Sequence, residues 1–175
     1  MNKHGFSLIE LIVVIAIIGI LLSIAVINFN RWQVKNNIEK QANTMYMEIT
    51  EARQLALTTR QARTVTFSAN SLVFRRYTSD ADLESGTGLW VKTVPLQYAI
   101  TTKPWVDPSS NPNITASDII FNTRGIMNQP TPKSLCIYSD VDPALDAIVI
   151  VQSRVAAGKI KSQGVDCGTS NIDIK

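Results

Sequence analysis

Few residues of this chain have side chains that commonly do chemistry. The 175 residues include one histidine, His4, and two cysteines, Cys136 and Cys167. A single histidine and two distant cysteines do not make a metal-binding cluster or a Ser/His/Asp set, and the chain has no glycine-rich phosphate loop. The cysteines are also too far apart for a redox CxxC motif. The sequence therefore predicts a protein that is not an enzyme and needs no cofactor or metal.

One acidic residue, Glu10, stands at the start of a long apolar run. Residues 11–30 contain no charged residue, and a helix of that length spans about 30 Å, which matches the hydrocarbon core of a bilayer. A carboxylate deep in that core costs on the order of 2.5–3.5 kcal/mol, and it is tolerated when a cation pairs with it. We therefore expect residues 6–30 to form a transmembrane or filament-core helix, and the position of Glu10 needs a functional reason.

The two cysteines lie far from this apolar run. An even pair of cysteines in an oxidising compartment is typical of a disulfide. Closing a loop of about 30 residues would stabilise the fold by roughly 3–4 kcal/mol and would tie the C-terminal tail to its domain. Two unpaired, buried thiols are the alternative.

Three carboxylates stand close together near the C-terminal end, at Asp140, Asp142 and Asp146. Calcium would need six or more oxygen ligands in a suitable loop, so we interpret the cluster as a solvated acidic turn. The net charge of the whole chain is +3. This weakly basic balance does not by itself indicate nucleic acid as a partner.

A long helix must position these residues, because the helical pattern continues past the apolar run. Neither proline nor glycine interrupts residues 20–62. We expect one helix over residues 7–61, whose amphipathic half, residues 31–62, packs on a domain. The stripe that predicts this packing recurs every three or four residues and consists of Ile38, Ala42, Met45, Ile49, Ala52 and Ala56.

From residue 63 onward the pattern alternates with period two and predicts a β-rich domain over residues 63–175. Residues 147–151 are apolar on both faces, so we expect a central strand there. Residues 159–161 alternate Lys-Ile-Lys, which is typical of an edge strand, and residues 103–117 read as a long surface loop because they contain three prolines. Trp90 and Trp105 fit either the domain core or a partner-facing surface. The remaining expected strands are 64–67, 72–75, 89–91, 96–98, 119–121 and 135–138.

The first residues of the apolar run carry a resemblance to a known family. Gly5-Phe6-Ser7-Leu8-Ile9-Glu10 resembles the type III signal of type IV pilins and of type II secretion pseudopilins. The resemblance implies that residues 1–5 are a leader, that a prepilin peptidase cuts after Gly5 and methylates Phe6, and that Glu10 meets the N-terminal ammonium of a neighbouring subunit during assembly. A secretory signal peptide or a plain anchor is the alternative. However, Gly5 precedes the apolar core, so the core would survive cleavage.

A second resemblance covers residues 119–167. The run Gly158-Lys159-Ile160-Lys161, followed by Cys167, is similar to the tail of the FimT, FimU and GspH minor pilins and pseudopilins, with lysines where that tail often has arginines. The resemblance implies an α+β fold, in which a long N-terminal helix packs on an antiparallel β domain of two sheets.

The same resemblance implies a role. It is that of a minor pilin near the tip of a type IV pilus, with other major and minor pilins or pseudopilins and an inner-membrane assembly platform as partners. The protein would cross the inner membrane once, with a periplasmic C-terminal domain. A minor pseudopilin of type II secretion is one alternative. The other is a DNA-binding competence pilin, in which Arg154, Lys159 and Lys161 contact phosphates.

Overall fold

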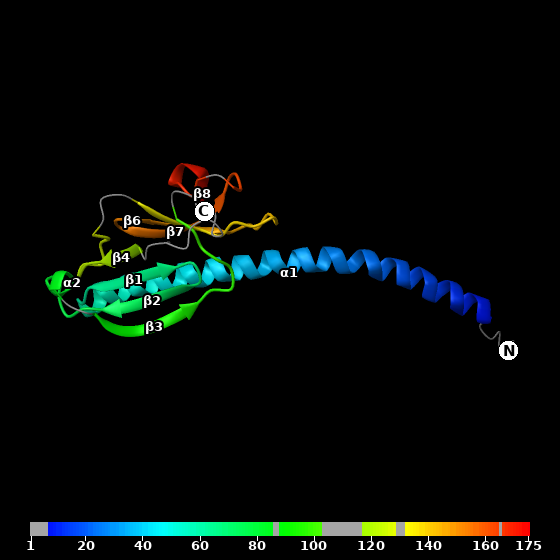
Figure 1. The fold of residues 1–175 in the computed structure, drawn as a ribbon, viewed down its shortest axis with the longest axis horizontal. Coiled ribbons are helices and arrows are strands. Elements are labelled where there is room, and N and C mark those ends of the chain that lie inside the picture. Colours follow the sequence, from blue (N-terminus) through cyan, green and yellow to red (C-terminus); the bar gives the residue numbers. More distant parts are fainter. Residues whose placement is uncertain (1–6, 86–87, 103–116, 129–131, 165) are drawn as a thin grey trace.

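The computed structural model describes residues 7–85, 88–102, 117–128, 132–164 and 166–175. One long helix, α1 (Leu8–Thr59), is followed by a domain of two antiparallel sheets. Figure 1 shows the C-terminal half of α1 lying against the sheets, while its N-terminal half extends away from the domain. The expected α+β fold, a long helix on two antiparallel sheets, is confirmed.

The helix begins after Ser7 and ends where Arg60 takes a left-handed conformation with φ of 52°. Its six-residue stripe is buried as expected, since no member from Ile38 to Ala56 is more than 5% exposed. Both sheets contact α1, through β1 and β4 on one side and β6 and β7 on the other. The apolar stripe of α1 therefore lies at the centre of the domain core.

The first sheet has the order β3-β2-β1-β4 and the second has the order β5-β6-β7-β8, and all neighbouring pairs are antiparallel. The expected central strand, residues 147–151, is β6 and lies inside the second sheet. The connection after β4 fits closely against α1, because Gly125, with φ of +66°, would bring a Cβ to 3.1 Å from the Arg53 carbonyl oxygen. The strands are β1 (Arg63–Ser68), β2 (Ser71–Arg76), β3 (Leu89–Pro95), β4 (Ser117–Phe121), β5 (Lys133–Cys136), β6 (Ala147–Val151), β7 (Arg154–Ile160) and β8 (Ile172–Ile174), and a short helix, α2 (Asp82–Ser85), follows β2.

Two expectations about strands are wrong. Residues 159–161 are not an edge strand, because β8 pairs with the end of β7 and forms the edge instead. Gly158 makes this pairing close, since a Cβ there would lie 2.6 Å from Cγ2 of Ile172. Residues 96–98 are not a strand either. The surface loop expected over residues 103–117 falls almost entirely outside the described residues.

Gln41 explains why residues 96–98 leave the sheet. Its side chain is 8% exposed on α1, its Oε1 accepts hydrogen bonds from the backbone N–H groups of Gln97 and Tyr98 at 2.8 Å, and its Nε2 donates to the Tyr98 carbonyl oxygen at 2.7 Å. The side chain of Gln41 thus supplies backbone hydrogen bonds that a neighbouring strand would supply in a sheet. The helix and this connection are held together by three hydrogen bonds.

Replacing Gln41 tests this connection. We expect Gln41→Leu to lower the free energy of unfolding by about 1–3 kcal/mol, because it removes three partly buried hydrogen bonds to the backbone of residues 97 and 98. Chemical denaturation of the full chain in detergent measures the change. Gln54→Leu is the matched control, since Gln54 is an exposed glutamine of the same helix. Equal destabilisation by the two variants would contradict the assignment.

Candidate functional site

The N-terminal end of α1 holds the first group of predicted site residues. Gly5 and Phe6 lie outside the described residues, whereas Glu10 is placed in the first turn. The Ser7 backbone N–H donates to Oε2 of Glu10 at 3.0 Å, and both residues are exposed. In the single chain the carboxylate therefore caps its own helix, a favourable place for a negative charge. Because Glu10 is exposed, it is also open to a cation from a neighbouring chain.

The apolar half of α1 contacts no other part of the described chain. Its large apolar side chains from Leu8 to Leu22 are 45% to 76% exposed. An 18-residue window of this helix has a mean hydropathy of 3.0, and within the described residues α1 is long and apolar enough to cross a membrane by length and composition. Apolar surface of this extent needs lipid or other helices around it.

An aromatic pair and two cations follow the apolar run on α1. Trp32 is 58% exposed and its ring centroid lies 5.8 Å from that of Phe29. Arg31 and Lys35 stand beside Trp32 and line an open hollow with Asp140 and Asp142 of the domain. Tryptophan and basic residues are typical of a membrane–water boundary. This arrangement fits an apolar half in lipid and a domain outside it.

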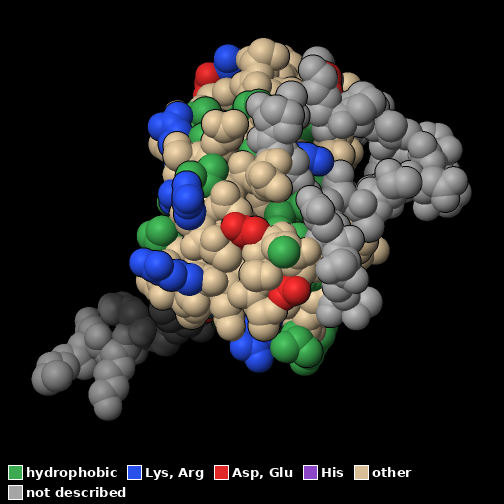
Figure 2. Space-filling view, turned by 90° about the vertical axis from the view of Figure 1, so that its left-hand side faces the viewer, with side chains coloured by type: hydrophobic (Ala, Val, Ile, Leu, Met, Phe, Trp, Pro, Cys, Tyr) green, Lys and Arg blue, Asp and Glu red, His purple; other side chains and the backbone are tan. Residues whose placement is uncertain are grey.

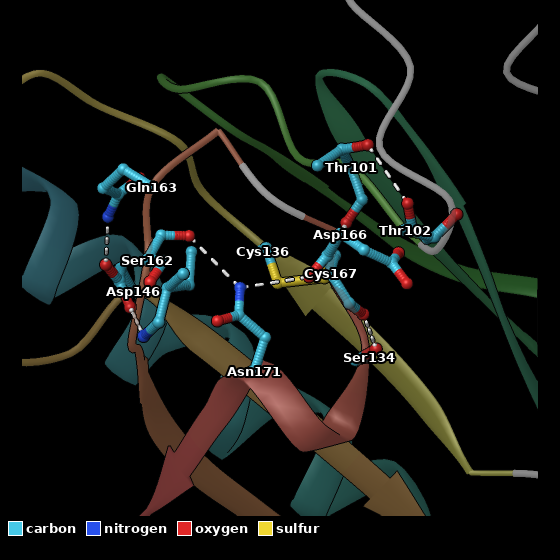
Figure 3. Close-up of a disulfide and its surroundings, with 11 residues drawn as sticks. Thr101, Thr102, Ser134, Cys136, Asp146, Ser162, Gln163, Asp166, Cys167 and Asn171 are labelled. Carbon is cyan, nitrogen blue, oxygen red and sulfur yellow. Dashed lines mark hydrogen bonds between the residues drawn. A yellow bond between two sulfur atoms is a disulfide. The ribbon is translucent and has the colours of Figure 1, made fainter.

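The C-terminal tail is fastened by the predicted disulfide. Cys136 and Cys167 are bonded, with Cα atoms 6.0 Å apart, and both residues are fully buried. Figure 3 shows the hydrogen bonds around the bond: Ser134 Oγ donates to the Cys167 carbonyl oxygen, and Asn171 Nδ2 donates to the carbonyl oxygen of Asp166 at 3.1 Å. The tail is thus attached to the end of β5, and the alternative of two free thiols is excluded.

The basic residues of the predicted DNA contact do not form one free cluster. Lys159 Nζ lies 2.7 Å from Oδ1 of Asp142, and Lys161 Nζ lies 3.3 Å from Oδ1 of Asp173. The hydrogen bond with Asp142 raises the pKa of Lys159. Arg154 is exposed at the opposite end of β7, about 17 Å along the strand from Lys159. Two of the three cations therefore already have carboxylate partners.

The acidic cluster is divided by the fold, and its interpretation as a solvated turn is wrong for Asp146. Asp140 and Asp142 are exposed, but Asp146 is fully buried immediately before β6. Its Oδ1 accepts from the Ile160 backbone N–H at 2.7 Å and its Oδ2 accepts from Gln163 Nε2 at 2.9 Å. Asp146 therefore joins β6 to the tail. No group of three or more His, Cys, Asp or Glu side chains placed to hold a metal occurs in the described part of the chain.

The burial of Asp146 predicts an unusual pH dependence. Burial raises the pKa of this carboxyl above its ordinary value, so its contribution to the free energy of unfolding is largest below pH 4 and decreases as the pH rises through the raised pKa. Asp146→Asn should remove this decrease, as measured by denaturation from pH 3 to pH 7. Asp142→Asn is the matched control. The hydrogen bond with Lys159 lowers the pKa of Asp142, so the contribution of Asp142 to the free energy of unfolding is lost as the pH falls. If both variants changed the pH dependence of stability in the same direction, both assignments would be contradicted.

The structure places one of the two tryptophans for which the sequence leaves core and surface open. Trp90 is 66% exposed on β3, which favours the partner-facing surface over the core, and Trp105 lies outside the described residues. Arg63, by contrast, is only 9% exposed at the start of β1. No sequence signal distinguishes it from the exposed arginines, because it stands at the turn between helix and sheet.

Comparisons with known proteins agree with this geometry. A model of the prokaryotic N-terminal methylation motif matches residues 1–26. No curated protein matches the sequence. Two crystal forms of the type IV minor pilin FimU of Pseudomonas aeruginosa share the fold, at 14% sequence identity. Their TM-scores are 0.54 and 0.51, over 78% and 74% of this chain and 99% of each FimU chain. The chain therefore carries a prokaryotic N-terminal methylation motif and shares the fold of the minor pilin FimU.

Proposed function

We propose that this protein is a minor pilin, a structural subunit that helps to prime assembly near the tip of a type IV pilus. The observation that carries the proposal is the division of α1 into two halves. One half is the core of a folded domain, and the other is an exposed apolar rod with a single carboxylate in its first turn. Such a rod can rest in lipid and later join a bundle of similar helices.

The methylation motif supports a proposal for processing and topology. In this proposal the prepilin peptidase removes residues 1–5 at the cytoplasmic face and methylates Phe6. The protein crosses the inner membrane once, and Lys3 stays inside in agreement with the positive-inside tendency. The domain from residue 63 to residue 175 stands in the periplasm, where an oxidising environment suits the Cys136–Cys167 bond.

Assembly would move the apolar half from lipid into contact with other pilins, supported by the inner-membrane assembly platform. Close packing of helices would then replace lipid around its side chains. Glu10 would exchange the local bond to Ser7 for the Phe6 ammonium of a neighbour. This ion pair would compensate the charge of the carboxylate in an apolar environment and would set the register between the two helices.

Deleting the gene tests the proposal against the pseudopilin alternative. We expect surface fibres to become fewer while the export of secreted proteins stays unchanged. The reverse result would assign the chain to a type II secretion pseudopilus. The subunit role itself requires that the purified fibres of the parent strain contain the chain, and its absence from them would overturn the proposal.

The DNA-binding alternative has less support, because Lys159 and Lys161 each pair with a carboxylate. Replacing both lysines with Gln in a strain that still makes fibres separates it from the structural role. Unchanged retention and uptake of DNA would exclude these lysines as the DNA contact. A loss of uptake with intact fibres would favour the competence pilin.

A further inference from the structure

The open hollow beside Arg31, Trp32 and Lys35 lies where the apolar run of α1 ends. Its volume is about 430 Å³, and its opposite wall includes Asp140 and Asp142 of the domain. A volume of this size is in the range of sites that bind small ligands. Figure 1 shows the segment after β5, in yellow, reaching back along α1 toward the N-terminal half of the helix. The hollow is therefore on the side of the domain that faces the apolar half of α1.

The acidic wall of the hollow is fastened to the rest of the fold. Glu39 Oε1 accepts a hydrogen bond from the Ala144 backbone N–H at 2.6 Å, and Asp142 Oδ1 lies 2.7 Å from Lys159 Nζ. Lys175 Nζ donates to the Ala144 carbonyl oxygen at 2.7 Å. These contacts join the segment after β5 to α1, to β7 and to the C-terminus. The two walls of the hollow are thus held in place without a ligand.

Most of the charges that line the hollow have no partner in the chain. Within the described residues, Arg31 and Lys35 form no ion pair and no side-chain hydrogen bond, although like charges one turn apart destabilise a helix. Asp140 likewise has no such partner among these residues. Lys159, and after it Lys35, lower the pKa of Asp142, so this second carboxylate already has its cation. The hollow therefore offers two cations on the helix and one carboxylate opposite them.

The position of the two cations along α1 matches the headgroup layer of a membrane. Arg31 directly follows the apolar run, residues 11–30, and Lys35 stands about 6 Å farther along the helix axis. The headgroup layer on each side of a bilayer is roughly 5–7 Å thick. The rings of Phe29 and Trp32 are more than half exposed, and exposed aromatic rings are typical of this depth. With the apolar run in lipid, the two cations lie at the level of the lipid phosphates.

Positive charge alone would not locate such a site. Figure 2 views the end of the domain farthest from the N-terminus, where basic side chains follow one margin. That end lies about 40 Å along α1 from Arg31, beyond the reach of a bilayer around the apolar run. The hollow differs because its cations adjoin the apolar run and stand opposite a carboxylate.

The arrangement of charges favours a phospholipid headgroup with a primary amine beside its phosphate. A phosphate accepts hydrogen bonds from the guanidinium fork of Arg31 and from the ammonium of Lys35, and a primary ammonium donates hydrogen bonds to Asp140. A phosphoglycerol headgroup would leave Asp140 without a cation, and the quaternary ammonium of choline has no N–H to donate. A nucleic-acid strand would bring a row of phosphates against Asp140 and Asp142, which would repel it.

We propose that this hollow binds the headgroup of a membrane phospholipid of the phosphoethanolamine class, with Arg31 and Lys35 on the phosphate and Asp140 on the ammonium. The site rests on the proposed function, because it requires the apolar half of α1 in lipid and the domain outside. It adds a ligand for the stage before assembly, when a bound lipid holds the domain in one orientation at the membrane surface.

Native mass spectrometry of the full chain in detergent tests the proposal. The added lipid is phosphatidylethanolamine or phosphatidylcholine with the same acyl chains, and the dissociation constant of the first bound lipid is measured. We expect phosphatidylethanolamine to bind about tenfold more tightly, as a gained charge-assisted hydrogen bond would give. Soluble phosphoethanolamine should bind more weakly than the lipid, because it has no acyl chains to contact the apolar half of α1.

Two variants separate the phosphate contact from the ammonium contact. Asp140→Asn should weaken the binding of phosphatidylethanolamine about tenfold and leave that of phosphatidylcholine unchanged, whereas Arg31→Gln should weaken both about tenfold, because both lipids carry the phosphate. Lys40→Gln is the matched control, since Lys40 is an exposed cation of the same helix outside the hollow. Because Arg31 and Asp140 are exposed, neither change disturbs the core.

The proposal is overturned if the parent chain binds the two lipids equally well, if Asp140→Asn keeps the preference, or if Arg31→Gln acts no more strongly than Lys40→Gln. Equal affinity for soluble phosphoethanolamine would overturn the assignment to a lipid. The proposed function fails by a different result, the absence of the chain from purified fibres, so the two failures are distinguishable.

Discussion

Glu10→Leu is expected to leave the chain in the membrane and almost absent from fibres. An apolar side chain at residue 10 rests in lipid more favourably than a carboxylate. In the proposed bundle, however, it would leave the Phe6 ammonium of a neighbouring subunit without a partner. Removing one member of a buried ion pair costs about 3–5 kcal/mol, which corresponds to a loss of incorporation by roughly two to four orders of magnitude. Quantifying the chain in sheared fibres and in membranes measures this ratio.

The amide variant separates charge from helix capping. Glu10→Gln keeps an oxygen that can accept the hydrogen bond from the Ser7 N–H, but it has no negative charge. We expect it to be excluded from fibres nearly as strongly as the leucine variant, with unchanged amounts in the membrane. Normal incorporation of Glu10→Gln would show that Glu10 acts only as a cap of its own helix.

Loss of the disulfide should have the largest effect on the stability of the domain. We expect Cys136→Ala with Cys167→Ala to lower the free energy of unfolding by about 3–4 kcal/mol, the value for closing a loop of about 30 residues in the chain-entropy model. The tail that carries Lys161 and β8 would then be held by β-pairing and by hydrogen bonds, among them those of Ser134, Asp146 and Asn171. Chemical denaturation in detergent, with and without a reductant, measures the difference.

The reductant provides the internal control. The parent chain should lose the same free energy when reduced, whereas the double alanine variant should not respond to the reductant. Because both cysteines are fully buried, reduction should require unfolding or strong denaturant. Equal stability of the parent and the variant under oxidising conditions would contradict a structural role of the bond.

The sequence predicted the parts of the fold that depend on local pattern. The stripe from Ile38 to Ala56 follows from helical spacing alone, and each member is buried. The central position of β6 follows from a run of apolar residues. The pairing of Cys136 with Cys167 followed from there being only two cysteines. The two-sheet arrangement came from the resemblance to pilins.

The features that the sequence did not predict depend on contacts between distant segments. Gln41 is one position from a stripe residue, and only the approach of residues 97 and 98 decides that it is buried and bonded. Asp146 looks like its exposed neighbours until Gln163 and the end of β7 reach it. The strand β8 is only three residues long, too short for an alternating pattern, so the pattern predicts the sheet edge at residues 159–161 instead. Arg63, the first residue of β1, is buried beside the C-terminal part of α1.

Mass spectrometry of the mature N-terminus tests the central claim most directly. In the proposed function, α1 is a processed pilin helix that lies in the membrane only before assembly. The chain purified from the membranes and fibres of its own cells should begin at Phe6, with one added methyl group on the terminal amine, and Gly5→Ala should leave it uncut. A chain that still begins at Met1, or one cut after the apolar run, would contradict the account, because Glu10 would then have no neighbouring terminal ammonium to meet.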